Sequence, residues 1–270
     1  MAGNNLFDIK KRVIAANQTR KITRTMELIA SSRLQRGKAK LAHFRVWAEH
    51  MQEAAACLAD RYFEPLGKLP ADSQNAYIVF GGSKGLSGYY SPSLLQYATP
   101  IVAGHIVMAV GSAAEKFFPD AHSHLGNEVP SAAYTQGIAQ AAMALYEGRE
   151  AKAVYMVYAK GSQHVTEQLL PLAHIRGESP AYVIAEPSPQ GLNPVLYREY
   201  VQTLVHEAHL QAFLAEQIAR VAAMDSATRN ADEIIENLQT TYNRIRQASI
   251  TQEIVTVSNA VKGDGGRYGQ

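Results

Sequence analysis

The sequence predicts an α/β protein in which a small domain containing a β-sheet is inserted between two very long helices. Residues 4–64 contain no proline and only one glycine, and residues 195–262 contain neither. Both segments have apolar residues at helical spacing. The middle, about residues 75–187, instead alternates short apolar runs with turn residues, a pattern typical of alternating strands and helices.

The first long helix is predicted over residues 1–64. Its apolar residues recur mostly at steps of three, four and five, which places them along one side of a helix. They are Ile9, Val13, Ile14, Ile22, Met26, Ile29, Leu34 and Leu41.

The inserted α/β domain is predicted over residues 65–193. "AYIVFGG" (76–82), "HIVMAVG" (105–111) and "AKAVYMVYAKG" (151–161) are typical of strands. "PSLLQYA" (92–98) and "SAAYTQGIAQAAMALYEG" (131–148) are typical of helices. Strands that alternate with helices favour an open sheet with parallel strands.

The second long helix is predicted over residues 194–262, with a flexible Gly-rich tail over 263–270. At about 1.5 Å per residue, this segment spans roughly 100 Å, far longer than a typical globular helix. Such a length predicts a coiled coil, in which apolar residues step by threes and fours. The residues with this spacing are Ile218, Val221, Met224, Ala227, Ala231, Ile234, Leu238, Tyr242, Ile245 and Ala248.

Composition excludes several kinds of protein. The chain has 270 residues, of which 47% are apolar and 19% charged, as is ordinary for a folded chain. Cys57 is the only cysteine, which excludes an intrachain disulfide and a thiolate metal cluster. No apolar run approaches the ~20 residues needed to span a bilayer, and the N-terminus lacks a signal-peptide pattern. We therefore expect a cytoplasmic location.

The stretch "VFGGSKGLSG" (79–88) raises the question of a phosphate-binding loop. Such loops point backbone N–H groups of a Gly-rich turn at the anion and add a lysine. The spacing does not fit, because the phosphate-loop motif needs a lysine directly after its second invariant glycine and a Ser or Thr after that. We therefore interpret the glycines as residues of a strand-to-helix turn.

The remaining polar residues do not form a recognisable active site. His122 and His124 would share one face of a strand, and His206 and His209 one face of a helix, but no carboxylate cluster accompanies either pair. We expect these histidines to be solvated surface residues. No serine has a nucleophile-elbow motif around it, and Cys57 lies in an Ala-rich stretch. We therefore predict no catalytic, cofactor-binding or metal-binding residue.

The first long helix is strongly basic. Between residues 10 and 40 there are ten Lys or Arg residues and one acid, Glu27. Three interpretations are open: a solvated face, a nucleic-acid-binding face, or a face for an acidic protein surface. The residues between the charges are Ile, Met, Thr and Ala rather than stacking or base-reading residues, which favours a protein partner.

The two long helices carry a specific resemblance. "IKKRVIAANQTRKITRTMELIASSRLQRGK" (9–38) resembles the N-terminal helix of the gamma subunits of rotary F-type ATP synthases, and "YNRIRQASITQEIVTVSNAV" (242–261) resembles their C-terminal helix. "GGSKGLSGYYS" (81–91) is similar to a strand-end signature of that family. Lys84, Gly85, Leu86 and Gly88 match this signature, whereas Ser83, Ser87, Tyr89 and Ser91 depart from it.

The resemblance implies an architecture and a role. The terminal helices would form a long antiparallel coiled coil, and the inserted domain would be Rossmann-like but bind no nucleotide. The chain would be the central-stalk rotor of an F-type ATP synthase, coupling rotation of a membrane c ring to catalysis on the beta subunits. It would not be an enzyme by itself. Its partners would be the alpha and beta subunits, the epsilon subunit and the c ring, at the cytoplasmic face of the cell membrane.

The resemblance also implies contact residues. Lys21, Arg24, Met26, Arg246, Gln247, Thr251 and Gln252 match positions that meet the alpha/beta ring. Glu186, in "VIAEPSP", matches an acidic residue at the foot on the c ring, and Gly85 and Gly88 match structural turn residues. Gly37 stands where the family prefers strong helix formers. Glycine costs about 1 kcal/mol in a helix interior, so Gly37 suggests a local bend in the first long helix.

Two other functions stay open at this point. One is a coiled-coil adaptor without a link to nucleotide chemistry, and the other is a basic coiled coil that binds nucleic acid.

Overall fold

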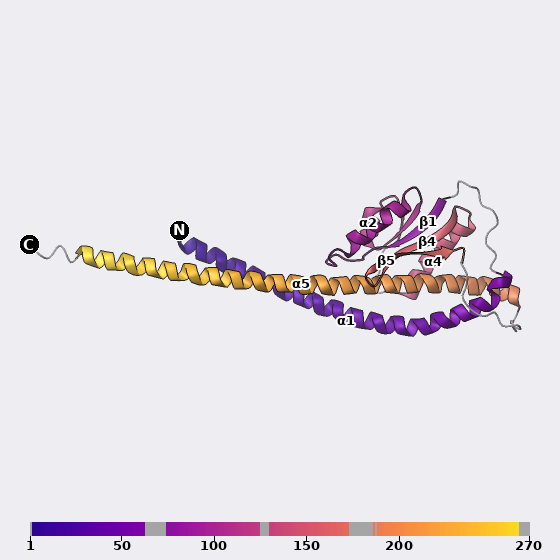
Figure 1. The fold of residues 1–270 in the computed structure, drawn as a ribbon, viewed down its shortest axis with the longest axis horizontal. Coiled ribbons are helices and arrows are strands. Elements are labelled where there is room, and N and C mark those ends of the chain that lie inside the picture. Colours follow the sequence, from indigo (N-terminus) through magenta and orange to yellow (C-terminus); the bar gives the residue numbers. More distant parts are fainter. Residues whose placement is uncertain (1, 63–73, 125–129, 173–185, 187, 265–270) are drawn as a thin grey trace, which may run out of the picture. The chain divides into compact units, whose positions relative to one another are not determined.

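A computed structural model describes residues 2–62, 74–124, 130–172, 186 and 188–264. Two very long helices, α1 (Ala2–Tyr62) and α5 (Pro189–Asp264), enclose the remaining elements in the sequence (Figure 1). The chain divides into two compact units: a coiled-coil unit, Met1–Leu28 with Met224–Gln270, and an α/β unit, Ile29–Ala223. Both long helices contribute to both units.

In the coiled-coil unit, α1 and α5 run antiparallel. Arg20 pairs with Asp232 at 3.1 Å, and three residues later on α1, Thr23 bonds to Thr228 at 2.8 Å, so the numbering rises on one helix and falls on the other. The more buried residues of α5 follow one another at steps of mostly three and four, which is the spacing of a coiled-coil seam. They are Met224, Ala227, Thr228, Ala231, Ile235, Leu238, Tyr242 and Ile245.

The α/β unit contains a five-stranded sheet in the order β3-β2-β1-β4-β5. The strands are β1 (Gln74–Phe80), β2 (Ile106–Val110), β3 (His122–His124), β4 (Ala151–Lys160) and β5 (Gln163–Leu170). The first four pair in parallel, as predicted, whereas β5 pairs antiparallel to β4. The last five residues of β1 are all buried because helices cover both faces of the sheet there.

The antiparallel strand β5 was not predicted from the sequence. Five of its eight residues, "QHVTEQLL", are polar, as suits an edge strand that is mostly not fully buried. Lys160 pairs with Gln163, and Gly161 in the intervening two-residue turn has φ +64°. Glycine takes this backbone conformation without strain, so the "KGSQ" stretch forms a hairpin rather than the end of a strand.

Helices cover the sheet on both faces. One face packs on α4 (Ala132–Glu147) and on α5 through Val201, Val205 and Ala208. The other packs on α2 (Tyr90–Val102) and α3 (Ser112–Phe117). Helix α2 contains the predicted helical segment 92–98, α4 covers the predicted segment 131–148 except for its first and last residues, and α3 is an additional short helix.

In the α/β unit, α1 also packs antiparallel on α5. Leu41 contacts Leu210 and Leu214, and Met51 lies with Tyr200. Gly37 lies at this contact: a Cβ built on it would come within 2.7 Å of Leu214 Cδ2. Helix α1 continues through Gly37. Close approach of the two helices therefore explains this glycine, and the local bend suggested by the sequence stays a prediction.

The ends of the long helices lie near the predicted boundaries. Helix α1 ends at Tyr62, and α5 begins at Pro189 rather than at residue 194. Ser188 explains the earlier start, because its Oγ accepts a hydrogen bond from Gly191 N at 3.2 Å and its carbonyl accepts one from Leu192 N. The division at residues 64, 193 and 262 into functional domains stays a prediction.

Candidate functional site

The C-terminal part of α5 presents an exposed surface. All residues from 246 to 259 except Ser249 are exposed, including four large apolar ones. Ile250 is 48% exposed, Ile254 63%, Val255 51% and Val257 63%. A helix that leaves apolar side chains on several sides in solvent is typical of a segment that binds another protein.

The four contact residues predicted on α5 all lie on this exposed segment. Arg246, Gln247, Thr251 and Gln252 are exposed. Gln247 and Thr251 lie one turn apart on the same side of the helix, and Thr251 Oγ1 donates to the Gln247 carbonyl at 2.9 Å. The side chains of Arg246, Gln247 and Gln252 therefore present polar groups to solvent.

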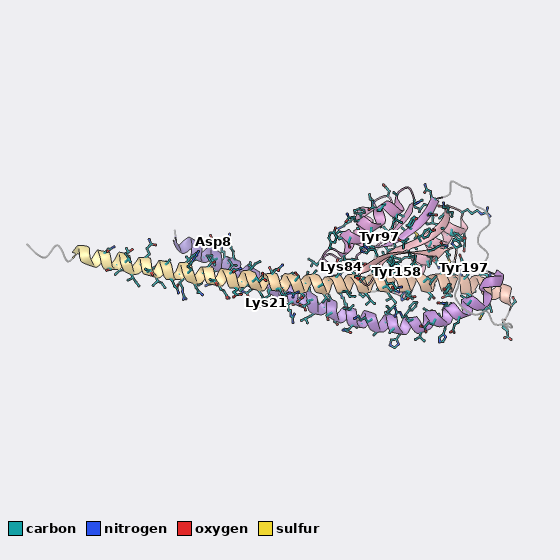
Figure 2. The ribbon with its side chains drawn as sticks, viewed as in Figure 1. Asp8, Lys21, Lys84, Tyr97, Tyr158 and Tyr197 are labelled. Carbon is teal, nitrogen blue, oxygen red and sulfur yellow. The ribbon has the colours of Figure 1, made fainter. Side chains whose placement is uncertain are left out.

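The three contact residues predicted on α1 differ in their surroundings. Lys21 is exposed on α1 in the coiled-coil unit (Figure 2). Arg24 is exposed but forms an ion pair with Glu27 at 2.9 Å, and Met26 is half-buried. The basic charge of this segment is thus partly neutralised at Arg24.

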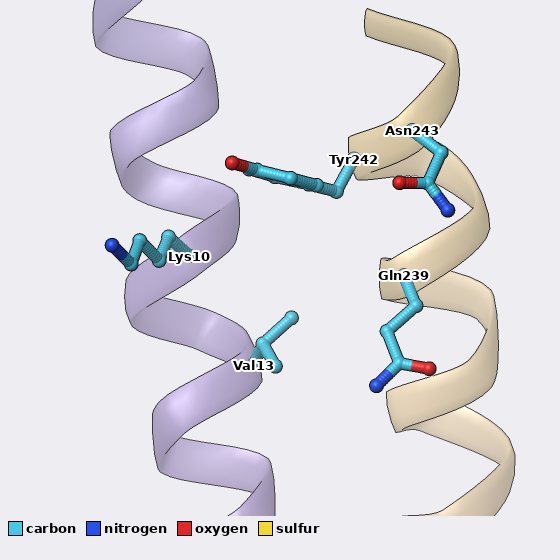
Figure 3. A pocket seen from close by; sticks show the side chains of 5 residues that line it. All are labelled: Lys10, Val13, Gln239, Tyr242 and Asn243. Atoms are coloured by element: carbon cyan, nitrogen blue, oxygen red, sulfur yellow. The ribbon is translucent and has the colours of Figure 1, made fainter. Parts of the chain in front are cut away.

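The coiled-coil unit contains an open pocket between its two helices. Its volume is about 380 Å³, and it is lined by Lys10, Val13, Gln239, Tyr242 and Asn243. Tyr242 points from α5 toward α1, and Val13 points from α1 toward α5 (Figure 3). We interpret the pocket as a gap in the seam, because Gln239 and Asn243 replace the apolar residues that would fill it.

The glycine loop between β1 and α2 is shaped by close contacts. Gly81 N donates to the Val110 carbonyl at 2.8 Å, and a Cβ on Gly81 would come within 2.8 Å of Ala114 N. Gly88 has φ +57°, where glycine is favoured, whereas a Cβ on Gly85 would meet nothing within 4 Å. The structural role predicted for Gly85 and Gly88 stays a prediction.

The same loop does bind an anion, which is a carboxylate of the chain itself. Backbone N–H groups of Ser83 and Lys84 donate to the Glu216 carboxylate at 3.3 and 3.4 Å. Arg220, one turn further along α5, forms an ion pair with Glu216 and donates to the Lys84 carbonyl at 3.1 Å. The composition of the loop, which resembles that of a phosphate-binding loop, therefore serves a contact between the loop and α5 within the chain.

Sequence reasoning missed Glu216 and Arg220. Their signal was present, because a Glu and an Arg four residues apart in the largely apolar stretch "AFLAEQIARVAAM" form an i,i+4 pair that must be buried with the helix. The loop that they bind lies more than 130 residues away in the sequence, and nothing local indicates that separation.

The prediction of solvated histidines is wrong for His206 and His209, which are both buried. His206 Nδ1 lies 2.9 Å from Thr135 Oγ1, and the His209 ring lies near the rings of Phe80 and Tyr134. Burial, with a smaller contribution from Lys40, lowers the pKa of His206 to about 4. Burial, followed by His206 and Lys40, lowers the pKa of His209 to about 3. Both rings are neutral at pH 7.

The predicted foot residue Glu186 is exposed. Its neighbours Ala185 and Pro187 lie outside the described residues. Within the described ranges, no three His, Cys, Asp or Glu side chains come together as a metal site. Across the same part of the chain, no helix has the length and apolar character needed to cross a membrane.

These features define a class of protein. Two long helices run antiparallel, an α/β unit is inserted between them in the sequence, the C-terminal part of α5 is exposed, and the loop suited to an anion is occupied internally. This is the design of a structural subunit with a helical shaft, and comparison with known proteins identifies its family.

The family model described as ATP synthase matches residues 5–262, so this chain belongs to the ATP synthase family. It is 30% identical to the ATP synthase gamma chain of Alkaliphilus metalliredigens, over 94% of this chain and 97% of that protein. It is 29% identical to the gamma chain of Ruminiclostridium cellulolyticum, over 93% of this chain and 96% of that protein.

Solved structures share the fold. The rotor of the Euglena gracilis mitochondrial ATP synthase, in rotational state 1, aligns with a TM-score of 0.64 and 13% identity, over 92% of this chain and 99% of that chain. A second Euglena gracilis structure, of the OSCP/F1/c-ring in rotational state 3, aligns with a TM-score of 0.69 and 14% identity, over 99% of this chain and 98% of that chain. The central stalk and c ring of the Tetrahymena thermophila mitochondrial ATP synthase include a chain that aligns with a TM-score of 0.57 and 17% identity, over 76% of this chain and 99% of that chain.

The predicted fold and family are thus confirmed. The chain belongs with the ATP synthase gamma chains, and its fold is that of the solved rotor and central-stalk chains. The assignment of individual residues to individual partners is a separate question.

Proposed function

We propose that the C-terminal end of α5 is the part of the shaft that enters a ring of alternating alpha and beta subunits. The observation that carries this proposal is the run of exposed residues from 246 to 259, with Ile250, Ile254, Val255 and Val257 in solvent. A ring of apolar and polar protein surfaces would cover these side chains. Arg246, Gln247, Thr251 and Gln252 would make the polar contacts.

The shaft acts by being asymmetric. Two different helices present a different set of side chains in each direction, so three identical beta subunits around them meet three different surfaces. Each contact stabilises one catalytic state over the others by the difference in contact free energy. Rotation then moves each beta subunit through the states in turn.

The basic surface of α1 supplies a second contact. Lys21 and Arg24 carry positive charge in a segment where ten basic residues face one acid, so an acidic surface of a beta subunit fits them. Met26 is half-buried and would contribute an apolar contact beside them. Charged contacts that break and re-form without a large dry interface suit a shaft that must turn.

The α/β unit and Glu186 form the membrane-proximal end. We place Glu186 against the c ring, and the epsilon subunit against the α/β unit, at the cytoplasmic face of the cell membrane. The c ring then drives rotation of the shaft. The order of elements supports this assignment, because residue 186 comes before the first residue of α5, Pro189, whereas residues 246–259 lie near the C-terminal end of that helix.

Co-purification with matched variants tests the proposal. A tagged wild-type chain should bring alpha and beta subunits with it, whereas Ile254→Asp together with Val257→Asp should lose them. Val46→Asp together with Trp47→Asp is the control, because these changes place the same two charges at exposed apolar positions of α1 outside the proposed contact. Equal recovery of the ring with both variants would contradict the proposal. An adaptor would bring other chains, and a nucleic-acid-binding coiled coil would carry absorbance at 260 nm.

A further inference from the structure

We propose that Glu216 and Arg220 form a lock that fixes the sheet of the α/β unit to α5, so that torque entering the α/β unit passes into the shaft. Glu216 and Arg220 are then positioning residues of the rotor. The inference rests on the proposed function, because it needs the α/β unit to receive torque.

The contacts of the lock fall on successive turns of α5. Tyr90 of α2 donates its hydroxyl to the Ala212 carbonyl at 3.1 Å. One turn later Glu216 accepts the two loop amides, and one turn after that Arg220 donates to the Lys84 carbonyl. Residues four apart lie on the same side of a helix, so one stripe of α5 holds the start of α2 and the loop before it.

The two charged side chains of the lock are almost fully buried. The side chain of Arg220 is 10% exposed and that of Glu216 is 5% exposed. A buried ion pair contributes little net stability compared with apolar residues of the same size, but loss of one member leaves an unpaired buried charge. The stability that the pair contributes therefore does not explain why a charged pair occupies this buried position. A requirement for fixed geometry explains it better.

Fixed geometry is what a torque-bearing joint requires. Apolar contacts such as Val201, Val205 and Ala208 against the sheet resist separation, but they depend only weakly on the register between the two surfaces. Hydrogen bonds to a charged group depend on distance and angle. The Glu216 carboxylate meets two backbone amides and Arg220 at once, which defines one register of α5 along the sheet.

The position of the lock in the fold supports this role. The loop follows β1 at the carboxyl end of a parallel strand, where open α/β sheets bind ligands. In this chain a carboxylate from α5 occupies that position. Ser112 Oγ, at the start of α3, donates to the Ser83 carbonyl at 2.7 Å and holds the loop from the sheet side. The end of the sheet where other proteins bind ligands thus binds α5 in this chain.

Amide exchange tests the lock in the isolated full-length chain. Glu216→Ala should raise hydrogen exchange at Ser83 and Lys84 by about tenfold or more, because the two amides lose their acceptor. Glu216→Gln should have a smaller effect, since its amide oxygen still accepts. Asp225→Asn is the matched control, because Asp225 forms an exposed i,i+4 pair with Arg229 on the same helix. Unchanged exchange in Glu216→Ala would overturn the lock, whatever the fate of the proposed function.

Coupling is tested in the assembled complex. Glu216→Ala and Glu216→Gln should hydrolyse ATP but pump fewer ions per ATP into vesicles than wild type and Asp225→Asn. If Glu216→Ala does not assemble, Glu216→Gln decides. If the wild-type complex pumps normally and the Glu216 variants pump as many ions per ATP as it does, the lock is overturned. The proposed function is not affected by that result. A wild-type chain that never joins the ring would count against the proposed function instead, while amide exchange still tests the lock.

A covalent replacement separates positioning from general damage. A Cβ on Gly88 would lie 3.3 Å from the Ala223 Cβ, close to the separation in disulfides, although Gly88 has φ +57° and its substitution strains the loop. Gly88→Cys with Ala223→Cys, added to Glu216→Gln and Cys57→Ser, should regain coupling on oxidation and lose it on reduction. Absence of recovery in the oxidised, cross-linked complex would contradict a positioning role.

Discussion

Thr228 of α5 donates its hydroxyl to the Thr23 hydroxyl of α1 at 2.8 Å, across the seam of the coiled-coil unit. Thr23 is buried, and its own hydroxyl donates a hydrogen bond to the Arg20 carbonyl at 3.1 Å. A polar pair at a seam position fixes the register of two helices at some cost in stability. The Arg20–Asp232 ion pair lies on the neighbouring turns.

This pair predicts a difference between single and double substitutions. Thr23→Val should lower the free energy of unfolding of the coiled-coil unit by about 1 kcal/mol, because the hydrogen bond between the two helices is lost and Thr228 keeps only the Met224 carbonyl of its own helix as an acceptor. Thr23→Val with Thr228→Val should be nearly neutral, because both polar groups are removed. Hydrogen exchange of residues 224–235 in the isolated chain measures both. Equal loss of protection in the single and double variants would show that the pair does not act as a unit.

The two buried histidines predict acid sensitivity of the α/β unit. The unfolded chain takes up protons near pH 6.5, whereas His206 and His209 in the folded chain do so near pH 4 and 3. Stability is therefore full above about pH 6.5 and falls as the pH drops toward 4, by up to about 1.4 kcal/mol per pH unit for each histidine.

His209→Phe isolates one of these contributions. The His209 ring lies among aromatic rings, and its Nδ1 is buried without a hydrogen-bond partner in the described structure, so an apolar ring suits the site. The variant should lose less stability between pH 7.5 and 5 than wild type, as measured by urea unfolding at each pH. The exposed His43→Gln serves as control and should follow wild type. Identical pH slopes for wild type and His209→Phe would count against a buried neutral ring.

The exposed polar residues of α5 predict a defect in catalysis without a defect in assembly. A charge-assisted hydrogen bond to a partly buried partner contributes about 1.5–3 kcal/mol, so Arg246→Ala should lower ATP turnover by roughly tenfold or more. Gln247→Ala should lower it less. Arg244→Ala is the matched control, because Arg244 is exposed on nearly the opposite side of the same turn. Steady-state hydrolysis by the purified complex is the measurement, and wild-type rates in Arg246→Ala and Gln247→Ala would refute these contacts.

The basic residues of α1 predict a salt-dependent defect. Lys21→Glu should weaken torque transfer to an acidic surface, and the effect should shrink as ionic strength rises, because salt screens exposed charges. Arg24→Glu should act in the same direction but also leaves Glu27 without its ion pair. Lys38→Glu, an exposed reversal elsewhere on α1, is the control. ATP-driven ion pumping in vesicles at low and high salt measures this, and a defect of Lys21→Glu that does not vary with salt would contradict a charge contact.

Local patterns predicted much of this fold. Apolar spacing located α1, α5 and five further elements, since the period of a helix or a buried strand is visible in the residues themselves. Long-range contacts were not predictable in this way. Nothing near Gly37 indicates that Leu214 lies against it, and nothing near Ser83 indicates that Glu216 accepts its amide proton. His206 and His209 were misjudged for the same reason, because the sheet that buries them comes from distant parts of the sequence.

The most direct test of the central claim is rotation of this chain in a fixed ring. Lys152 is exposed on β4, so Lys152→Cys in a Cys57→Ser background offers an attachment point for a bead on the α/β unit. With the catalytic ring immobilised, ATP should turn the bead in one direction with three equally spaced stops. Steady ATP hydrolysis by complexes whose attached beads stay still would contradict the account of this chain as the rotor shaft.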